Sequence, residues 1–235
     1  MAEPLKLAGV TVVFDLDGTL VDTAPDLVAS LNVCLVDAGY APVEAPHVQG
    51  QIGLGSRAMI CTALEVLGET TSDGKIDEMR RVFLEHYAEN TANQSRPYPN
   101  VITALDGLAA AGATLAICTN KPQSLADTLI KELELTHRFK AIVGSDSVPA
   151  HKPDAGHILR TIELAAGSAD RAIMIGDSNP DEKAAQNAGL PFIFIPFGYG
   201  PIDAATSARK ELADYTQLTA DFIMSYLYLF RPQPE

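Results

Sequence analysis

The stretch that decides the fold is residues 10–19, which read VTVVFDLDGT. Its first five residues are mostly β-branched or aromatic, as is typical of a buried strand. Two acids, Asp15 and Asp17, follow this run directly. Asp-Gly between apolar runs can also mark a hairpin turn, so the segment alone leaves two alternatives open. An EF-hand loop is a poor third one, because the later ligands and the closing Glu are missing.

Outward from this stretch, short apolar runs alternate with longer helical patterns. Strands are predicted at residues 10–14, 114–118, 141–144, 172–175 and 192–195. Helices are predicted at residues 101–111, 123–133, 155–166 and 181–188. Because strand and helix alternate, we expect an α/β fold in which helices cover both faces of a parallel sheet.

The interval between the first two strands is far longer than a βαβ crossover needs. Apolar residues recur there at helical spacing in three stretches, which end near Gly39, near Gly68 and around Tyr87. The segment Arg96-Pro97-Tyr98-Pro99 then reads as a stiff return. We therefore predict a core of residues 1–21 and 95–235 and a helical insert of residues 22–94.

Charge and cysteine content narrow the class of protein. The formal net charge is −13, which argues against nucleic acid or an anionic membrane as the main partner. An anionic substrate would therefore need a bound cation nearby. Three cysteines without a CxxC pair favour a reducing compartment. No signal peptide is recognisable, and the apolar run 222–230 is far shorter than the ~20 residues of a membrane span. We expect a cytoplasmic protein.

Unusual polar residues follow the other predicted strands. Thr119-Asn120 comes after the second, Lys152-Pro153 after the third, and Gly176-Asp177-Ser178, with Asp181 further on, after the fourth. In open parallel sheets, ligands bind outside the carboxyl ends of the strands. These side chains are therefore expected to meet Asp15 and Asp17 at one edge.

In order and spacing, these four segments resemble the motifs of the haloacid dehalogenase superfamily phosphatases. The resemblance implies a Rossmann-like core with strand order 5-4-1-2-3, and it implies that the insert is a C1-type cap. Segments 15–27, 52–55 and 197–200 are further similar to the phosphoglycolate phosphatase branch.

The resemblance also implies roles in phosphoryl transfer. Asp15 would be the nucleophile, and Asp17 the general acid and base. Mg²⁺ would be held by Asp15, Asp177 and the main-chain carbonyl of Asp17. Lys152 would place its charge beside Asp15 and the phosphoryl group.

Other side chains would bind the substrate. Thr119 and Asn120 would hydrogen-bond the phosphoryl oxygens, although Asn120 could equally cap the following helix. Asp181 could orient Lys152 or a metal-bound water, or cap a helix itself. Residues 21–94 contain four Lys or Arg against eleven Asp or Glu. Arg57, one of those few cations, could reach a substrate carboxylate or could simply be solvated.

The expected activity is Mg²⁺-dependent hydrolysis of a phosphomonoester through an aspartyl-phosphate, with 2-phosphoglycolate the leading substrate. The alternatives are a phosphatase or phosphomutase for another small metabolite, such as a sugar phosphate, a nucleotide or pyrophosphate, or a catalytically silent interaction protein. The expected partner is a small phosphorylated metabolite, with neither nucleic acid nor membrane, and the expected state is a monomer or homodimer.

Overall fold

A six-stranded parallel sheet forms the centre of the protein, for which a computed structural model describes residues 6–200, 202–203 and 209–230. Its strands lie in the order β5-β4-β1-β6-β7-β8. Their bounds are β1 Thr11–Phe14, β4 Thr114–Cys118, β5 Ala141–Val143, β6 Ala172–Gly176, β7 Phe192–Phe194 and β8 Arg209–Glu211. The most buried strand, β1, is hydrogen-bonded to β4 on one side and to β6 on the other.

This topology confirms the predicted strand order. When β2 and β3, which form a separate pair, are set aside, the run β7-β6-β1-β4-β5 is the order 5-4-1-2-3. One strand of this sheet was not predicted, because β8 has the sequence RKE and carries no apolar signal, and the short strands β2 and β3 were not predicted either. The hairpin alternative for Asp17-Gly18 is excluded, since β1 pairs with β4 and β6 rather than with the chain that follows the turn.

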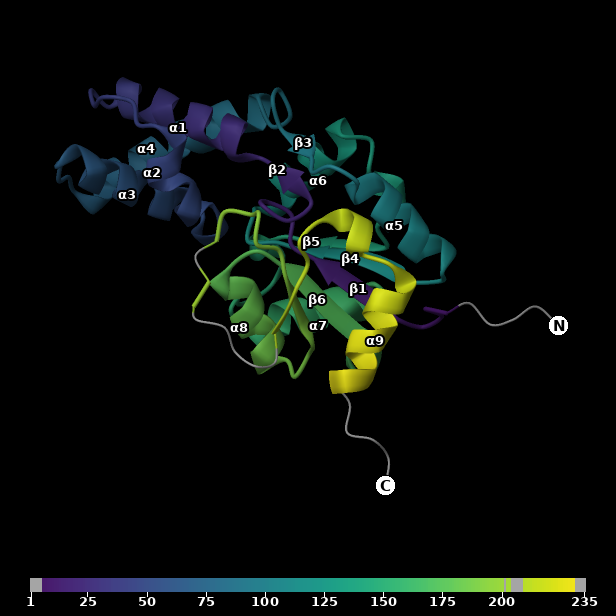
Figure 1. Ribbon diagram of the computed structural model, residues 1–235. Helices are drawn as coiled ribbons and strands as arrows, with labels where there is room; N and C mark the ends of the chain where they lie inside the picture. The colour runs from purple at the N-terminus through teal and green to yellow at the C-terminus, as the bar shows by residue number, and fades with distance from the viewer. Residues whose placement is uncertain (1–5, 201, 204–208, 231–235) are drawn as a thin grey trace.

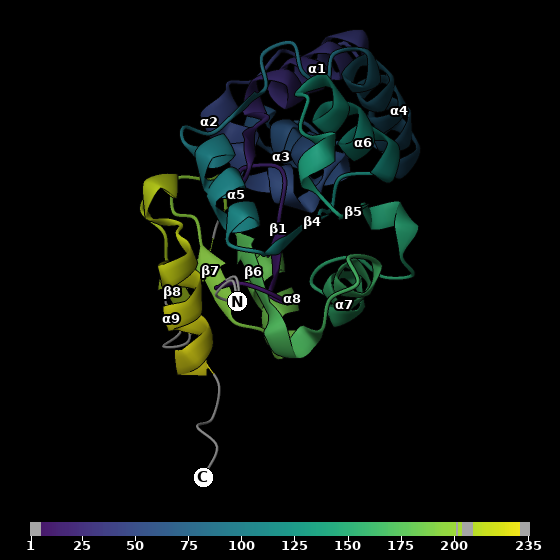
Figure 2. The same ribbon diagram turned by 90° about the vertical axis from the view of Figure 1, so that its right-hand side faces the viewer.

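Helices cover both faces of the sheet. Along β1, Val12 and Phe14 point into one core, with helices α5 (Val101–Ala110), α6 (Gln123–Glu132) and α9 (Ala220–Phe230). Val13 points into the other, with α7 (Ala155–Leu164) and α8 (Asn179–Asn187). This alternation follows from the strand period of two. Figure 2 shows α9 and α7 on opposite sides of the strands.

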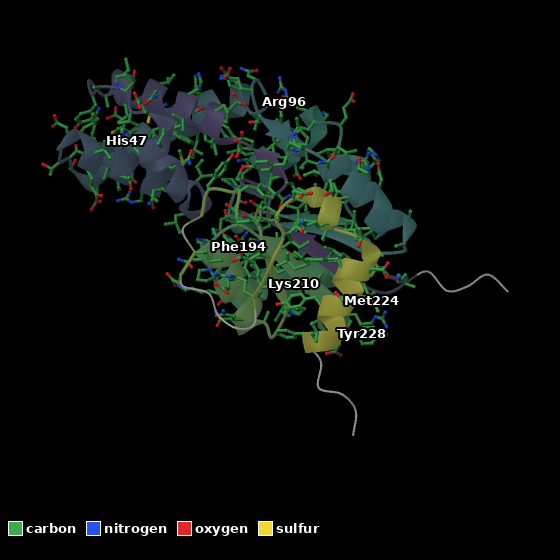
Figure 3. The ribbon with its side chains drawn as sticks, viewed as in Figure 1. His47, Arg96, Phe194, Lys210, Met224 and Tyr228 are labelled. Atoms are coloured by element: carbon green, nitrogen blue, oxygen red, sulfur yellow. The ribbon has the colours of Figure 1, made fainter. Side chains whose placement is uncertain are left out.

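The predicted core helices are confirmed, and α8 begins two residues earlier than expected. The apolar run 222–230 belongs to α9, on which Figure 3 labels Met224 and Tyr228. Lys210 of β8 lies over the rings of Phe222 and Tyr226 of this helix. None of the described helices is long and apolar enough to cross a membrane. Short 3₁₀ turns also occur, at Gln49–Leu54, Thr136–Arg138, Ser145–Ser147, Ala169–Arg171 and Tyr215–Gln217.

The long interval after β1 folds into helices that lie over the carboxyl end of the sheet (Figure 1). They are α1 Ala24–Asp37, α2 Ala45–Val48, α3 Ser56–Leu67 and α4 Asp73–Glu89. These helices share a hydrophobic core of their own, which includes Leu31, Ile60 and Phe83. Of the described residues that are buried in this core, Leu125 and Tyr199 alone come from outside the interval. The insert is thus a second packing unit.

Two short strands connect this insert to the sheet. β2 (Val21–Asp22) leaves the sheet and pairs antiparallel with β3 (Arg96–Pro97), which returns to it. Figure 3 places Arg96 at this connection and His47 within the insert, away from the sheet. The two crossings therefore lie side by side and form one narrow neck.

Buried side chains fasten both crossings. Tyr199 Oη accepts hydrogen bonds from the backbone N–H groups of Thr23 (2.6 Å) and Ala24 (2.8 Å) and donates one to Asp22 (2.6 Å). On the returning side, the carboxylate of Asp26 accepts from the backbone of residues 94 and 95 and from the Ser95 hydroxyl at 2.7–3.0 Å. The departing end of the insert is thereby held against the core, and its two ends are tied to each other.

Candidate active site

Lys152 joins two acids at the carboxyl edge of the sheet. Its Nζ lies 2.8 Å from Asp15 Oδ1 and 2.6 Å from Asp181 Oδ1, and its side chain is 1% exposed. Burial alone would lower the pKa of Lys152, but Asp15 and Asp181 outweigh it and raise that pKa above its ordinary value. The ammonium therefore stays charged beside Asp15.

The loop that carries Lys152 is held from behind by His157. The Lys152 backbone N–H donates to His157 Nδ1 (3.3 Å), so His157 Nε2 carries the hydrogen and donates to the Val143 carbonyl (3.1 Å). Burial, followed by the charge of Lys152, lowers the pKa of His157 to about 4. A neutral histidine thus ties the lysine loop to the end of β5.

Three buried carboxylates meet beside this lysine. Asp15, Asp177 and Asp181 each offer a carboxylate oxygen, and these oxygens lie within 4.8 Å of one another. Burial, followed by the charge of Asp181, raises the pKa of Asp15 to about 7. Lys152 acts in the opposite direction but does not outweigh them. Burial, followed by the charges of Asp181 and Asp15, raises the pKa of Asp177 well above its usual range. The carboxyl groups of Asp15 and Asp177 therefore resist ionisation unless a further cation joins them.

The charges of the site agree with a divalent cation. Its buried ionisable groups are four carboxylates and two ammonium groups: Asp15, Asp17, Asp177, Asp181, Lys121 and Lys152. When all six groups are ionised, their net charge is −2. Hard divalent cations such as Mg²⁺ prefer carboxylate oxygens. The donor set therefore fits the predicted metal, although it does not identify the ion.

Asp177 is fixed by two segments from other parts of the chain. Thr19 Oγ1 donates to its Oδ1 (2.8 Å), and the backbone N–H of Tyr199 donates to its Oδ2 (2.8 Å). Gly18 has φ +80°, and a Cβ there would lie 2.5 Å from Asp177 Oδ2. A Cβ at Gly198 or Gly200 would collide with the same residue. The glycines of segments 15–19 and 197–200 are thus required because the backbone approaches Asp177 closely.

Asp181 combines two of the roles left open by the sequence. Its Oδ1 pairs with Lys152, while its Oδ2 accepts hydrogen bonds from the Ser178 N–H (3.1 Å) and hydroxyl (2.6 Å). These last bonds belong to a capping box at the start of α8. Helix capping therefore aims the other oxygen of Asp181 at the lysine.

Asp17 has a buried partner that sequence reasoning missed. Lys121 Nζ lies 2.8 and 3.0 Å from the two carboxylate oxygens of Asp17, and the lysine side chain is 3% exposed. Burial alone would lower the pKa of Lys121, but Asp17 raises it above its ordinary value. Lys121 Nζ also lies 4.6 Å from the ring centre of Tyr87, on α4 of the insert. A signal was present, since Lys121 directly follows the strand-end pair Thr119-Asn120.

Thr119 and Asn120 lie at the same edge. Thr119 is buried after β4, and its Oγ1 accepts from the Lys121 N–H at 3.1 Å. Asn120 Nδ2 donates to the carbonyls of Lys152 (3.1 Å) and Gly53 (3.3 Å). The N-cap of α6 is Pro122, without a side-chain cap, so the helix-capping alternative for Asn120 is wrong. Asn120 instead links the lysine loop to the insert.

Arg57 is not brought to this cluster. It lies on α3, where its guanidinium pairs with Asp73 (2.5 Å) and Asp77 (2.7 Å), and 45% of its side chain is exposed. It lines a surface pocket of about 250 Å³ together with Arg80, His151 and Asn120. Contact between Arg57 and a substrate carboxylate stays a prediction that this geometry does not support.

Comparisons with known proteins agree with this site. The sequence profile of the haloacid dehalogenase-like hydrolases matches residues 12–195. A phosphoglycolate phosphatase of Agrobacterium fabrum is 48% identical over 187 residues, which cover 80% of each chain. One of Rhodospirillum rubrum is 32% identical over 227 residues, 95% of this chain and 92% of that one.

A solved structure extends the similarity to three dimensions. The crystal structure of a predicted phosphoglycolate phosphatase from Haemophilus somnus superposes with a TM-score of 0.81 at 28% identity, over 88% of this chain and 95% of that one. The resemblance predicted from the four motifs is confirmed, and the chain belongs to the haloacid dehalogenase-like hydrolase family.

Proposed function

We propose that this protein is a Mg²⁺-dependent phosphoglycolate phosphatase that converts 2-phosphoglycolate to glycolate and phosphate. The observation that carries the proposal is the position of Asp15, buried at the end of β1 between the Lys152 ammonium and the carboxylates of Asp177 and Asp181. The names and identities of the relatives from Agrobacterium fabrum and Rhodospirillum rubrum support the choice of substrate.

In the first step, a carboxylate oxygen of Asp15 attacks phosphorus in line with the ester oxygen. The oxygen–phosphorus bond to Asp15 forms while the ester bond breaks, and Asp17, which has to be protonated for this step, gives its proton to the leaving alkoxide. In the second step, Asp17 takes a proton from water, whose oxygen attacks the aspartyl-phosphate. Inorganic phosphate leaves, and the carboxylate of Asp15 is restored.

The remaining groups hold charge and position. Lys152 and Thr119 bind the phosphoryl oxygens, and Lys152 offsets the repulsion between two anions. Both N–H donors of the Asn120 amide are taken up by the carbonyls of Lys152 and Gly53, so Asn120 holds the lysine loop in position. Asp15, Asp177 and the main-chain carbonyl of Asp17 would hold Mg²⁺, which supplies charge neutralisation at the phosphoryl group when bound. The net charge of the buried site supports a divalent ion in this position.

The insert of residues 22–94 acts as a C1-type cap over a core of residues 1–21 and 95–235, some of which lie outside the described residues. Its place over the carboxyl end of the sheet supports a role in excluding bulk water from the first step. The partner is a small phosphorylated metabolite rather than nucleic acid or a membrane. We expect a cytoplasmic monomer or homodimer, in line with three free cysteines.

A phosphate-release assay on a panel of phosphorylated compounds tests the proposal. The panel contains 2-phosphoglycolate, glucose 1-phosphate, AMP and pyrophosphate, each with Mg²⁺, and Asp15→Asn serves as the control for contaminating phosphatases. We expect the highest kcat/KM for 2-phosphoglycolate. Isomerised sugar phosphate would indicate a phosphomutase, and phosphate release from none of the compounds would favour a silent interaction protein.

A further inference from the structure

A small cavity lies between the insert and the sheet, next to Asp17. Its volume is about 40 Å³, and its walls come from α1, α3 and α4 of the insert and from the loop before α6. Among the described residues, Asp17 lines this cavity and Asp15 does not. Since Asp17 is the proposed acid for the ester oxygen, the cavity lies on the side where the leaving group departs.

Apolar walls surround two polar groups in this cavity. Leu27, Met59 and Phe83 supply much of the apolar lining. Lys121 is the one cation among the described lining residues, and its hydrogen bonds to Asp17 use two of its three N–H donors. The hydroxyl of Tyr87 is buried and makes no well-aligned hydrogen bond with the residues that the structure describes, although the Lys121 ammonium lies beside it.

The lack of a well-aligned hydrogen bond at Tyr87 Oη is informative, because a buried hydroxyl without one is unfavourable. Tyr87 is 1% exposed, so bulk water does not satisfy this group. Its ring packs against the Lys121 ammonium at 4.6 Å. An ammonium and a hydroxyl therefore come from two residues that line the same small space, and both can donate to an anion.

The size of the cavity limits that anion. A water molecule needs about 10–15 Å³ of such space, so 40 Å³ holds roughly three waters. This suits a carboxylate that is one methylene away from the ester oxygen. A sugar ring or a nucleoside does not fit without movement of the insert.

We propose that Lys121 and Tyr87 form the subsite that binds the leaving-group carboxylate, which selects phosphomonoesters of 2-hydroxycarboxylates. This inference rests on the proposed phosphatase function and assigns its specificity to two residues. Lys121 belongs to the core and Tyr87 to the insert, so a bound carboxylate bridges the two units. The closed position of the insert is therefore stabilised only by substrates that carry the carboxylate.

Burial favours Lys121 over Arg57 for this task. The guanidinium of Arg57 is half exposed and already paired with two acids, so its attraction for a further anion is screened by solvent. The ammonium of Lys121 is enclosed, where the interaction between charges is much stronger.

The test compares two esters that differ only in the carboxylate. Ethyl phosphate has the skeleton of 2-phosphoglycolate with a methyl group in place of the carboxylate. The measured quantity is the ratio of kcat/KM for 2-phosphoglycolate to that for ethyl phosphate, which cancels any general damage to Asp17. Lys121→Met is expected to reduce this ratio about 100-fold, and Tyr87→Phe about tenfold.

Surface variants supply the comparison. Lys75→Met removes a lysine that pairs with Glu78 on the exposed side of α4, and it should leave the ratio at its wild-type value. Arg57→Met tests the rival cation. If the ratio falls in Arg57→Met but stays within about threefold of wild type in Lys121→Met, the proposal is overturned.

If Lys121→Met does not fold, the wild-type enzyme and the Tyr87→Phe variant still test the proposed subsite. A wild-type preference for 2-phosphoglycolate below about tenfold, or an unchanged ratio in Tyr87→Phe, would also overturn the subsite. Failure of the function itself has a different signature, because the wild-type enzyme would then release phosphate from neither ester.

Discussion

The carboxyl edge of the sheet and the cavity under the insert are adjoining regions that are built in different ways. At the sheet edge, Asp15, Lys152 and Asp177 follow three strands of one sheet, and each is held by neighbours within the core. In the cavity, Lys121 comes from the core and Tyr87 from a helix of the insert. The first region can carry out chemistry on any phosphoryl group, whereas the second responds to what is attached to it. Each of the following experiments tests whether the two regions are separable in this way.

The largest effect is expected from Asp15→Asn, which removes the nucleophile from the sheet edge. We expect kcat to fall at least about 1,000-fold for every ester, including ethyl phosphate. Circular dichroism and thermal unfolding should show a folded protein. A purified variant that keeps more than about one-hundredth of the wild-type rate would contradict the assignment.

Metal removal should affect the sheet edge and spare the cavity. Treatment with a chelator is expected to lower activity at least about 100-fold, and Mg²⁺ should restore it. Mg²⁺ should also raise the Tm of the wild-type protein, because it relieves repulsion among the buried carboxylates. Asp177→Asn should weaken this rise. An equal rise in Asp177→Asn would place the ion elsewhere.

The neck between the two regions is tested by Tyr199→Phe. The change removes one donor and the acceptor for two backbone N–H groups, so we expect a loss of about 1–3 kcal/mol in the free energy of unfolding. Activity on 2-phosphoglycolate should fall about tenfold, since the position of the insert becomes less defined. Tyr228→Phe is a matched control, because Tyr228 is 64% exposed on α9. Equal behaviour of the two variants would show that the neck does not position the insert.

The last prediction concerns stability alone and is a pH dependence that arises from His157. Its pKa falls from 6.5 to about 4 on folding, so the unfolded chain binds a proton in this window and the folded protein does not. Stability is therefore undiminished above about pH 6.5 and declines as the pH falls towards 4. Urea unfolding across this range should show a shallower decline for His157→Gln than for wild type. Parallel curves would exclude the contribution.

Much of the fold and of the sheet edge could be predicted because both follow from local patterns. Strands such as β1 and β6 are continuous apolar runs, and parallel strand ends necessarily bring Asp15 and Asp177 to one edge. β8 escaped prediction because its three residues are charged, and its place depends on pairing with β7.

The cavity could not be predicted in the same way. Lys121 lies 104 positions from Asp17 along the chain, and only the packed structure turns it towards that acid and Tyr87. Arg57 was the obvious cation because so few occur in the insert, but its neighbours Asp73 and Asp77 on α4 take up its charge. Tyr199 was recognised only as part of a short motif, since its hydrogen bonds reach residues at the other end of the chain.

The antiparallel pair β2–β3 has a consequence for how such proteins can be recombined. Because the insert enters and leaves through adjacent two-residue strands, it can be grafted from one relative to another without altering the register of the central sheet. Lys121 and Leu125 lie outside that transplanted piece, although they complete its cavity and its hydrophobic core. A chimaera that exchanges only residues 22–94 would therefore receive only part of the residues that determine substrate specificity. To transfer the whole substrate specificity, the exchanged piece also has to include the start of α6.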